Sequence, residues 1–378
     1  MSSLVQLKRT PPLVEGQLRD VERSDDWRWQ LQNAVTRADQ LAQVIDLSAE
    51  ELTGAQRAQE SGFPISITPH YLSLIDAHDP QCPIRRQVVP RIEEGDSAPG
   101  DLHDPLGEVA HEVAPDLVQR YPDRALLLVS DRCAVYCRFC TRSRMVGDGG
   151  GPRSLDRLGP ALQYLKDHPE IRDVIISGGD PLVMASEKIR DIVAAVRAVP
   201  SVETIRIGTR VPVVLPQRIT GELLSALAPF HPLWIMTHFN HPKELTERAR
   251  QACRDLANAG FPVMNQTVLL RGVNDDPAVL SALFRGLVRE RVRPYYLLQA
   301  DPVKGTGHLR TPIARGLEIV RALQGQLSGI ALPKFIVDTP GGFGKVPLAP
   351  NYVLSSEAGI TRFITPRNVE VDYFDPPV

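Results

Sequence analysis

The chain has 378 residues, of which 43% are hydrophobic and 23% are charged, a composition typical of a globular protein with a sizeable core. Its formal net charge of −2 gives no electrostatic case for binding nucleic acid or an anionic membrane surface. It has no apolar run of membrane-spanning length, and residues 1–15 lack the apolar core of a signal peptide. Five cysteines, three of them clustered, argue against a disulfide framework and indicate a reducing cytoplasm.

Residues 1–118 are predicted to form a mostly helical N-terminal region. The amphipathic pattern predicts one helix from Trp27 through Ile45. A second helix is expected to begin at Ser48, because Glu51 follows three residues later and completes a capping box. A third is expected to follow Pro69 and to continue through Ile75.

From Arg124 onward, short apolar segments alternate with helical patterns at intervals that suit βα units. The expected strands are 124–130, 173–177, 203–208, 233–238, 263–270, 294–299 and 334–338. The expected helices are 154–167, 186–198, 220–228, 243–259, 278–290 and 313–326. Repeated βαβ units imply parallel strands with right-handed crossovers, and about six of them predict an incomplete barrel rather than a flat sheet.

Polar residues follow several of these strands, at the end of a barrel where chemistry is usually found. They are Cys133 after the first strand, Gly178–Pro181 after the second, His238 and His241 after the fourth, Asp301 after the sixth and Asp338 in the seventh. This coincidence predicts one shared site. The two histidines have the spacing of metal ligands, but no cysteine or carboxylate accompanies them, so we expect a lining or hydrogen-bonding role.

Three cysteines, Cys133, Cys137 and Cys140, share one loop after the first strand, with the spacing C-x3-C-x2-C. Thiolates suit iron–sulfur clusters or zinc. A cubane cluster usually takes four cysteines, so three would leave one iron open to another ligand. The alternatives are a redox C-x-x-C pair and a zinc site, but zinc needs a fourth ligand that no second cysteine pair supplies. The spacing therefore favours an iron–sulfur site.

Other positions allow two interpretations each. Gly178 and Gly179 would let a ligand approach the backbone closely, or would simply form a tight turn. Gln266 lies on an apolar strand and is either a ligand contact or a satisfied core amide. Two arginines and a phenol stand at the mouth of the first strand, where guanidinium groups could bind phosphate or form a solvated basic surface. These residues are Arg120, Tyr121 and Arg124.

A glycine-rich loop near the C-terminus carries Lys345. A lysine held in such a loop could form a Schiff base with pyridoxal 5′-phosphate (PLP). A Walker A loop also ends in Gly-Lys, but it requires Ser or Thr next and a longer spacing. Val346 follows Lys345 here, so we reject nucleotide phosphate binding.

Together these motifs resemble the lysine 2,3-aminomutase family of radical S-adenosylmethionine (SAM) enzymes. The resemblance extends from about Asp104 to Ser355 and covers motifs at 120–124, 133–144, 178–181, 205–210, 214–219, 265–275 and 340–345. It implies an α/β fold whose residues 119–340 form a partial TIM-type (β/α)6 radical SAM barrel. The mostly helical region would precede this barrel, and a short segment at 341–378 would carry the PLP lysine.

The resemblance also implies a 4Fe–4S cluster, SAM and PLP. The implied cluster ligands are Cys133, Cys137 and Cys140; the implied SAM contacts are Gly178, Gly179 and Gln266; the implied PLP residues are Lys345, Arg120, Tyr121 and Arg124. For the substrate, Arg142 would bind the carboxylate and Asp301 and Asp338 the distal ammonium of lysine. The sequence departs from the family pattern at Phe343, which stands where the family usually has glycine, and we expect this residue to reshape the substrate pocket.

The implied enzyme is an isomerase that moves the amino group of L-lysine from C2 to C3 to give β-lysine. It would take one electron from a donor such as a flavodoxin or ferredoxin, and would form a homo-oligomer. The alternatives are an aminomutase for arginine, for glutamate or for a lysine on translation elongation factor P, and a non-enzymatic iron–sulfur or zinc-binding module. Long family members have further cysteines that bind zinc, whereas no cysteine follows Cys253 here, so we expect no such zinc site.

Overall fold

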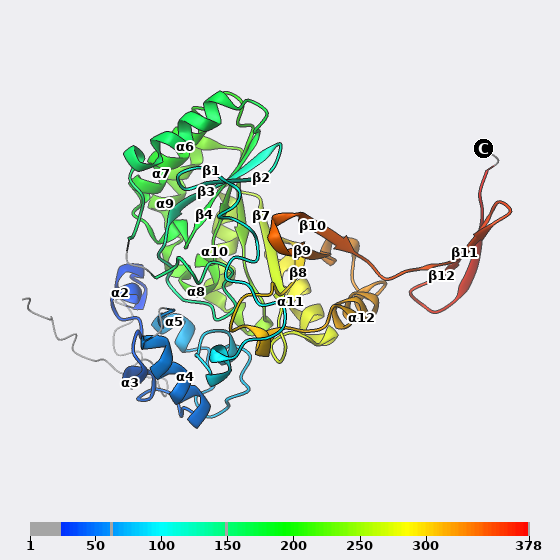
Figure 1. Cartoon of the computed structure of the whole chain (residues 1–378), viewed down its shortest axis with the longest axis horizontal. Helices are drawn as coiled ribbons and strands as arrows, with labels where there is room; N and C mark the ends of the chain where they lie inside the picture. Colours follow the sequence, from blue (N-terminus) through cyan, green and yellow to red (C-terminus); the bar gives the residue numbers. More distant parts are fainter. Residues whose placement is uncertain (1–23, 61–62, 148–149, 377–378) are drawn as a thin grey trace, which may run out of the picture.

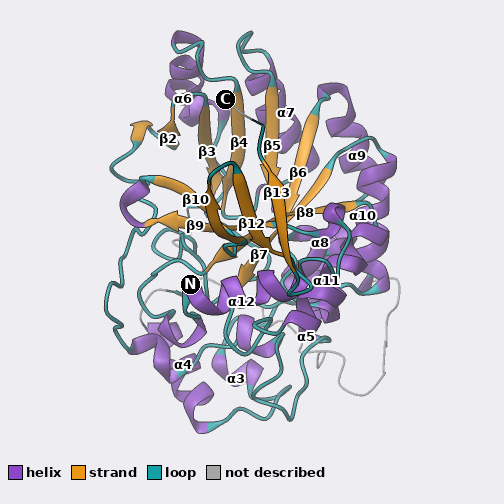
Figure 2. Cartoon of the chain, turned by 90° about the vertical axis from the view of Figure 1, so that its right-hand side faces the viewer, coloured by secondary structure: helices purple, strands orange, loops and turns teal. Residues whose placement is uncertain are grey.

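The computed structural model describes residues 24–60, 63–147 and 150–376 of the chain. Its centre is a curved ten-stranded sheet in which the strands follow one another in chain order (Figures 1 and 2). The strands are β1 (Glu112–Ala114), β2 (Leu117–Tyr121), β3 (Arg124–Ser130), β4 (Asp173–Gly178), β5 (Thr204–Gly208), β6 (Leu233–Thr237), β7 (Val263–Leu269), β8 (Val292–Gln299), β9 (Lys334–Thr339) and β10 (Gly344–Leu348).

Strands β3 to β9 are parallel to one another and form the predicted partial barrel. Helices connect successive strands: α6 (Leu155–Asp167), α7 (Ser186–Arg197), α9 (Gly221–Leu227), α10 (Glu247–Asn258), α11 (Pro277–Arg289) and α12 (Ile313–Leu323). The predicted α/β class is confirmed, and each expected strand and helix of this region forms close to its expected position.

Local sequence explains these elements. The side chains of Ser154, Thr220, Thr246 and Asp276 accept backbone hydrogen bonds at the first turns of α6, α9, α10 and α11. Along β4 and β7, fully buried residues alternate with half-buried ones. Because the buried residues pack against the surrounding helices, the half-buried ones face the interior of the curved sheet, where a site can form.

The N-terminal region contains α2 (Trp27–Gln32), α3 (Ala38–Leu41), α4 (Ala49–Glu60) and α5 (Pro69–Leu72). The prediction of one helix from Trp27 through Ile45 is wrong, because Val35 is extended and exchanges two backbone hydrogen bonds with Ile67. The helix expected after Pro69 spans only one turn. The predicted capping box is confirmed, since Ser48 and Glu51 exchange their hydrogen bonds.

Both ends of the sheet hold strands that the sequence patterns did not indicate. The predicted boundary at residue 118 falls inside β2, which pairs antiparallel with β3. At the other end β10 pairs antiparallel with β9. A separate exposed sheet of β11 (Val353–Glu357), β12 (Ile360–Ile364) and β13 (Glu370–Phe374) projects away from the barrel (Figure 1). No helix within the described ranges is both long and apolar enough to span a membrane.

Candidate active site

The cysteine loop leaves β3 and packs directly against the turn that follows β4. The amide of Gly179 donates to Ser130 O at 2.6 Å, and the amide of Asp180 donates to Arg132 O at 2.8 Å. A Cβ atom on Gly178 or Gly179 would lie 2.3 Å from one of these carbonyl oxygens. The two glycines are therefore required for the close packing of two loops, and their contact with SAM stays a prediction.

All three cysteines of this loop are free thiols. Burial raises the pKa of Cys140 to about 11 and raises the pKa of Cys133 well above its usual value. Among the described residues, no three His, Cys, Asp or Glu side chains gather closely enough to hold a single metal ion. The assignment of these three thiols to three corners of a cubane cluster stays a prediction.

The residues predicted to surround PLP lie together. Lys345 is on β10, and its backbone amide donates to Tyr121 Oη at 2.9 Å. The guanidinium of Arg124 stacks on the Tyr121 ring at 4.0 Å from the ring centre. Arg120 donates to Asp338 Oδ1 at 2.6 Å and to Gly342 O at 3.3 Å. The turn from β2 to β3 thus meets the β9–β10 hairpin at Lys345.

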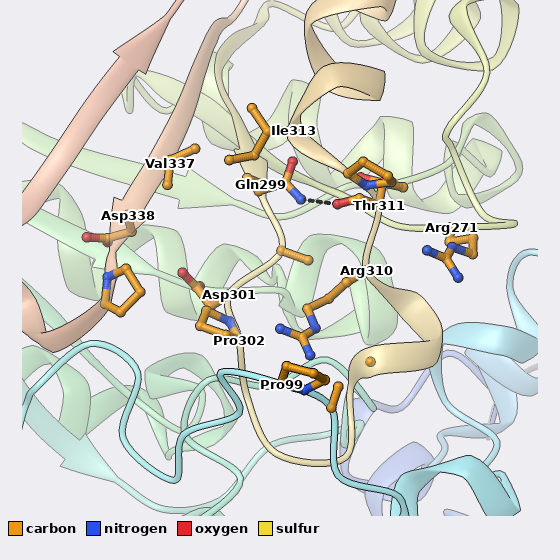
Figure 3. Close-up of a pocket in the computed structure, with 15 residues that line it drawn as sticks. Pro99, Arg271, Gln299, Asp301, Pro302, Arg310, Thr311, Ile313, Val337 and Asp338 are labelled. Atoms are coloured by element: carbon orange, nitrogen blue, oxygen red, sulfur yellow. Dashed lines mark hydrogen bonds between the residues drawn. The ribbon is translucent and has the colours of Figure 1, made fainter.

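The two predicted ammonium ligands, Asp301 and Asp338, face one end of a cavity of about 490 Å³ (Figure 3). Burial, followed by the negative charge of Asp338, raises the pKa of Asp301 to about 7. Burial acts in the same direction on Asp338, but a hydrogen bond from Arg120 and the charge of Lys345 outweigh it and lower the pKa of Asp338. The pair therefore consists of one firmly ionised acid and one that changes its charge near neutral pH.

Arg142, the predicted carboxylate ligand, is held by a residue that the sequence patterns did not single out. Its guanidinium contacts Glu108 Oε1 at 2.8 Å, and Arg144 contacts the other oxygen of Glu108, also at 2.8 Å. Glu108 is 3% exposed, and it precedes the barrel in a loop without a periodic pattern. The backbone amide of Arg142 lies 3.4 Å from Cys140 Sγ, which places this arginine beside the cysteine loop.

The remaining candidates are Gln266 and the two histidines. The Gln266 side chain is half-buried on β7, and its contact with SAM stays a prediction. His238 Nε2 lies 3.1 Å from Asn240 Oδ1, and burial lowers the pKa of His238 to about 3. His241 Nδ1 accepts from the amide of Lys243 at 3.1 Å. The two histidines therefore have hydrogen-bonding roles.

Two further findings concern residues around the site. Phe343 is 90% exposed and is not among the residues that line the cavity, and its effect on the substrate pocket stays a prediction. Arg210, which follows β5, places its guanidinium Nη1 2.6 Å from Cys137 Sγ. The position of Arg210 directly after a barrel strand is a sequence signal for a site residue. Its contact with Cys137 could not be predicted, because the two residues are 73 apart in the chain.

Comparison with known proteins identifies the family. The model of the radical SAM superfamily matches residues 127–283, and the model described as lysine-2,3-aminomutase matches residues 320–370. The chain is 47% identical to the L-lysine 2,3-aminomutase of Fusobacterium nucleatum over 357 residues, which cover 92% of this chain and 84% of that protein. It belongs to the lysine 2,3-aminomutase family.

Other members of the lysine 2,3-aminomutase family show a similar match. The L-lysine 2,3-aminomutase of Clostridium subterminale is 48% identical over 339 residues, or 89% of this chain and 81% of that protein. The glutamate 2,3-aminomutase of Clostridioides difficile is 41% identical over 336 residues, which cover 88% of this chain and 79% of that protein. The protein is thus an isomerase of the radical SAM aminomutases, a class that uses a 4Fe–4S cluster and SAM.

Proposed function

We propose that this protein is an L-lysine 2,3-aminomutase that uses PLP and moves the amino group of L-lysine from C2 to C3. The observation that carries the proposal is the position of two acids, Asp301 and Asp338, at one end of the cavity beside Lys345. The names of the relatives support it in part. The lysine enzymes of F. nucleatum and C. subterminale are 47% and 48% identical to this chain and the glutamate enzyme of C. difficile is 41% identical, whereas the L-lysine 2,3-aminomutase of Escherichia coli is 35% identical.

The cofactor residues have the chemistry that this reaction needs. Cys133, Cys137 and Cys140 would hold the cluster, and Lys345 Nζ would bind PLP covalently. When bound, the cluster and SAM supply a 5′-deoxyadenosyl radical, and PLP supplies a π-system that spreads unpaired electron density. Arg120 and Arg124 would neutralise the PLP phosphate, because guanidinium groups match phosphate oxygens in geometry and charge.

The substrate residues would act through charge. Arg142 would bind the α-carboxylate, and the two acids would neutralise the distal ammonium, because an unpaired buried cation is costly. Without substrate, Asp338 is neutralised by Lys345 and Arg120. The Asp338 carboxylate would be shared between these cations and the distal ammonium of lysine. Asp301 would release its proton to solvent as that ammonium arrives.

A glutamate substrate has one observation in its favour, because Arg271 and Arg310 also line the cavity, at the end away from the two acids (Figure 3). Arg310, however, is already bound to Asp101 at 2.5 Å. Asp301 and Asp338 would repel the second carboxylate of glutamate. The charges near Lys345 therefore favour lysine.

The test is anaerobic turnover of the purified protein after reconstitution with iron, sulfide and PLP, with SAM and dithionite supplied. L-lysine, L-arginine and L-glutamate are given in separate reactions, and the 3-amino isomers are separated by chromatography. The proposal expects β-lysine as the main product. Faster conversion of glutamate or arginine than of lysine would contradict it. If turnover occurs with flavodoxin but not with dithionite as the reductant, the result identifies the electron donor that the enzyme requires.

A further inference from the structure

The buried guanidinium of Arg210 contacts a cysteine that would hold the cluster, and the proposed reaction gives it no role. Arg210 is 8% exposed, and its Nη1 lies 2.6 Å from Cys137 Sγ. It reaches this sulfur because β5 ends beside β4 at the edge of the sheet where the cysteine loop also lies. A charged donor is thus placed at a sulfur that would ligate iron.

Arg210 cannot turn away from this sulfur, because its other polar groups are all engaged. The remaining partners of its guanidinium, at 2.6 to 3.2 Å, are Tyr71 Oη, Gln87 Oε1, His238 O and Glu244 Oε1. They come from α5, from the 3-10 turn at Arg85–Gln87 and from the segment that follows β6. Such a network fixes the direction of the guanidinium as well as its position.

The counter-ion of Arg210 lies on the side away from the cysteine. Glu244, which is fully buried, contacts Nη2 of Arg210, whereas Cys137 contacts Nη1. The second carboxylate oxygen of Glu244 accepts the backbone amides of Asn240 and His241 at 2.6 and 3.0 Å. The ion pair therefore presents its positive end to the sulfur.

We propose that Arg210 is a positioning residue that raises the reduction potential of the cluster through Cys137. The inference rests on Cys137 being a cluster ligand, as in the proposed function. Reduction takes one electron from an external one-electron reductant and adds one negative charge to the cluster, without breaking a bond. A hydrogen bond to a ligand sulfur and a fixed positive charge beside it both stabilise that added charge.

The test measures the midpoint potential of the reconstituted cluster in a redox titration followed by EPR, without SAM or substrate. Arg210→Gln should lower the reduced-to-oxidised ratio at a fixed solution potential at least tenfold, which for one electron equals 59 mV. Arg210→Lys, which keeps the charge, should shift the ratio less. Glu244→Gln removes the negative end of the ion pair, so it should shift the potential in the opposite direction.

Arg218→Gln is the matched control for loss of a buried guanidinium. Arg218 is fully buried and donates to Leu182 O and Met184 O, and it has no cysteine contact within the described residues, so the potential should stay at the wild-type value. The proposal is overturned if Arg210→Gln matches this control, or if Glu244→Gln shifts the potential in the same direction as Arg210→Gln. If the Arg210→Gln variant binds no cluster, the direction in which Glu244→Gln shifts the midpoint potential decides whether the proposal stands.

Iron and sulfide analysis of each variant separates this proposal from the proposed function. Wild-type protein without stoichiometric iron and sulfide would overturn both. Normal cluster content with an unchanged potential in Arg210→Gln would overturn the role of Arg210 alone.

Discussion

Lys345 and Asp338 are directly opposite each other in the β9–β10 hairpin, and their side chains form an ion pair. The residue proposed to bind PLP and one of the acids proposed to bind the substrate are therefore cross-strand neighbours. Arg120 contacts the same carboxylate of Asp338. This arrangement links the proposed cofactor residue to the substrate charge, because Asp338 pairs with both Lys345 and Arg120.

Reduction of the PLP-loaded protein with borohydride should fix the cofactor to Lys345. The reason is that the backbone amide of Lys345 donates to Tyr121, whose ring carries the guanidinium of Arg124, a group suited to phosphate. Peptide mass spectrometry locates the label, and Lys345→Ala should abolish both the label and the absorbance of the bound cofactor. Lys334→Ala is the control, since Lys334 is exposed at the start of β9. A label on Lys334 or Lys304 would show that the assignment is wrong.

Lysine turnover should fall on the acid side of neutrality. The pKa of Asp301 is raised to about 7, first by burial and then by the charge of Asp338. Below that pH Asp301 carries a proton and is neutral, so it cannot neutralise the ammonium of lysine; above it the ionised carboxylate can. The pH profile of kcat/KM should therefore show an acid limb near 7. Asp338→Asn should move this limb to lower pH, and Asp301→Asn should remove it.

Replacing Asp301 with Asn should weaken lysine binding while cofactor content stays unchanged. A hydrogen bond between charged groups contributes about 2 kcal/mol, so KM for lysine should rise roughly 30-fold. Initial rates at a range of lysine concentrations measure this, with PLP and iron assayed on the same samples. Asp372→Asn is the control, because Asp372 pairs with Arg362 in the exposed C-terminal sheet. An unchanged KM would remove Asp301 from the substrate site.

Alanine at Cys133, Cys137 or Cys140 should abolish cluster binding and SAM cleavage. These three free thiols share one loop, whereas the equally free Cys253 is buried in α10. Cys253→Ala should keep full iron and sulfide content and lose only some stability through the small cavity it creates. Analysis of anaerobic protein for iron, sulfide and zinc checks this. Stoichiometric zinc without sulfide in the wild type would contradict an iron–sulfur site.

The barrel could be predicted from the sequence because its strands and helices have regular apolar periods and clear caps, as at Ser154 and Thr246. The first helix was predicted too long because the pairing of Val35 with Ile67 depends on a distant segment. The strands β11 to β13 were not predicted, because their exposed residues show no apolar face. A regular spacing of apolar residues indicates which side chains are buried, so it does not reveal strands whose side chains are mostly exposed.

The candidate site could be predicted only where a motif carries its chemistry locally. The cysteine loop and the loop around Lys345 do so, and the structure brings Lys345 together with Arg120, Tyr121 and Asp338. Glu108 and Arg210 were missed as site residues because their contacts join segments that are far apart in the chain. Single residues of this kind have no spacing that a sequence pattern can register.

The most direct test of the proposed function is to follow the nitrogen of L-lysine labelled with ¹⁵N at C2 during anaerobic turnover. The proposal predicts that the label appears on C3 of β-lysine, as detected by NMR, and that this product is lost in Lys345→Ala. Lysine that keeps its label on C2 under conditions where glutamate is converted to its 3-amino isomer would contradict the account.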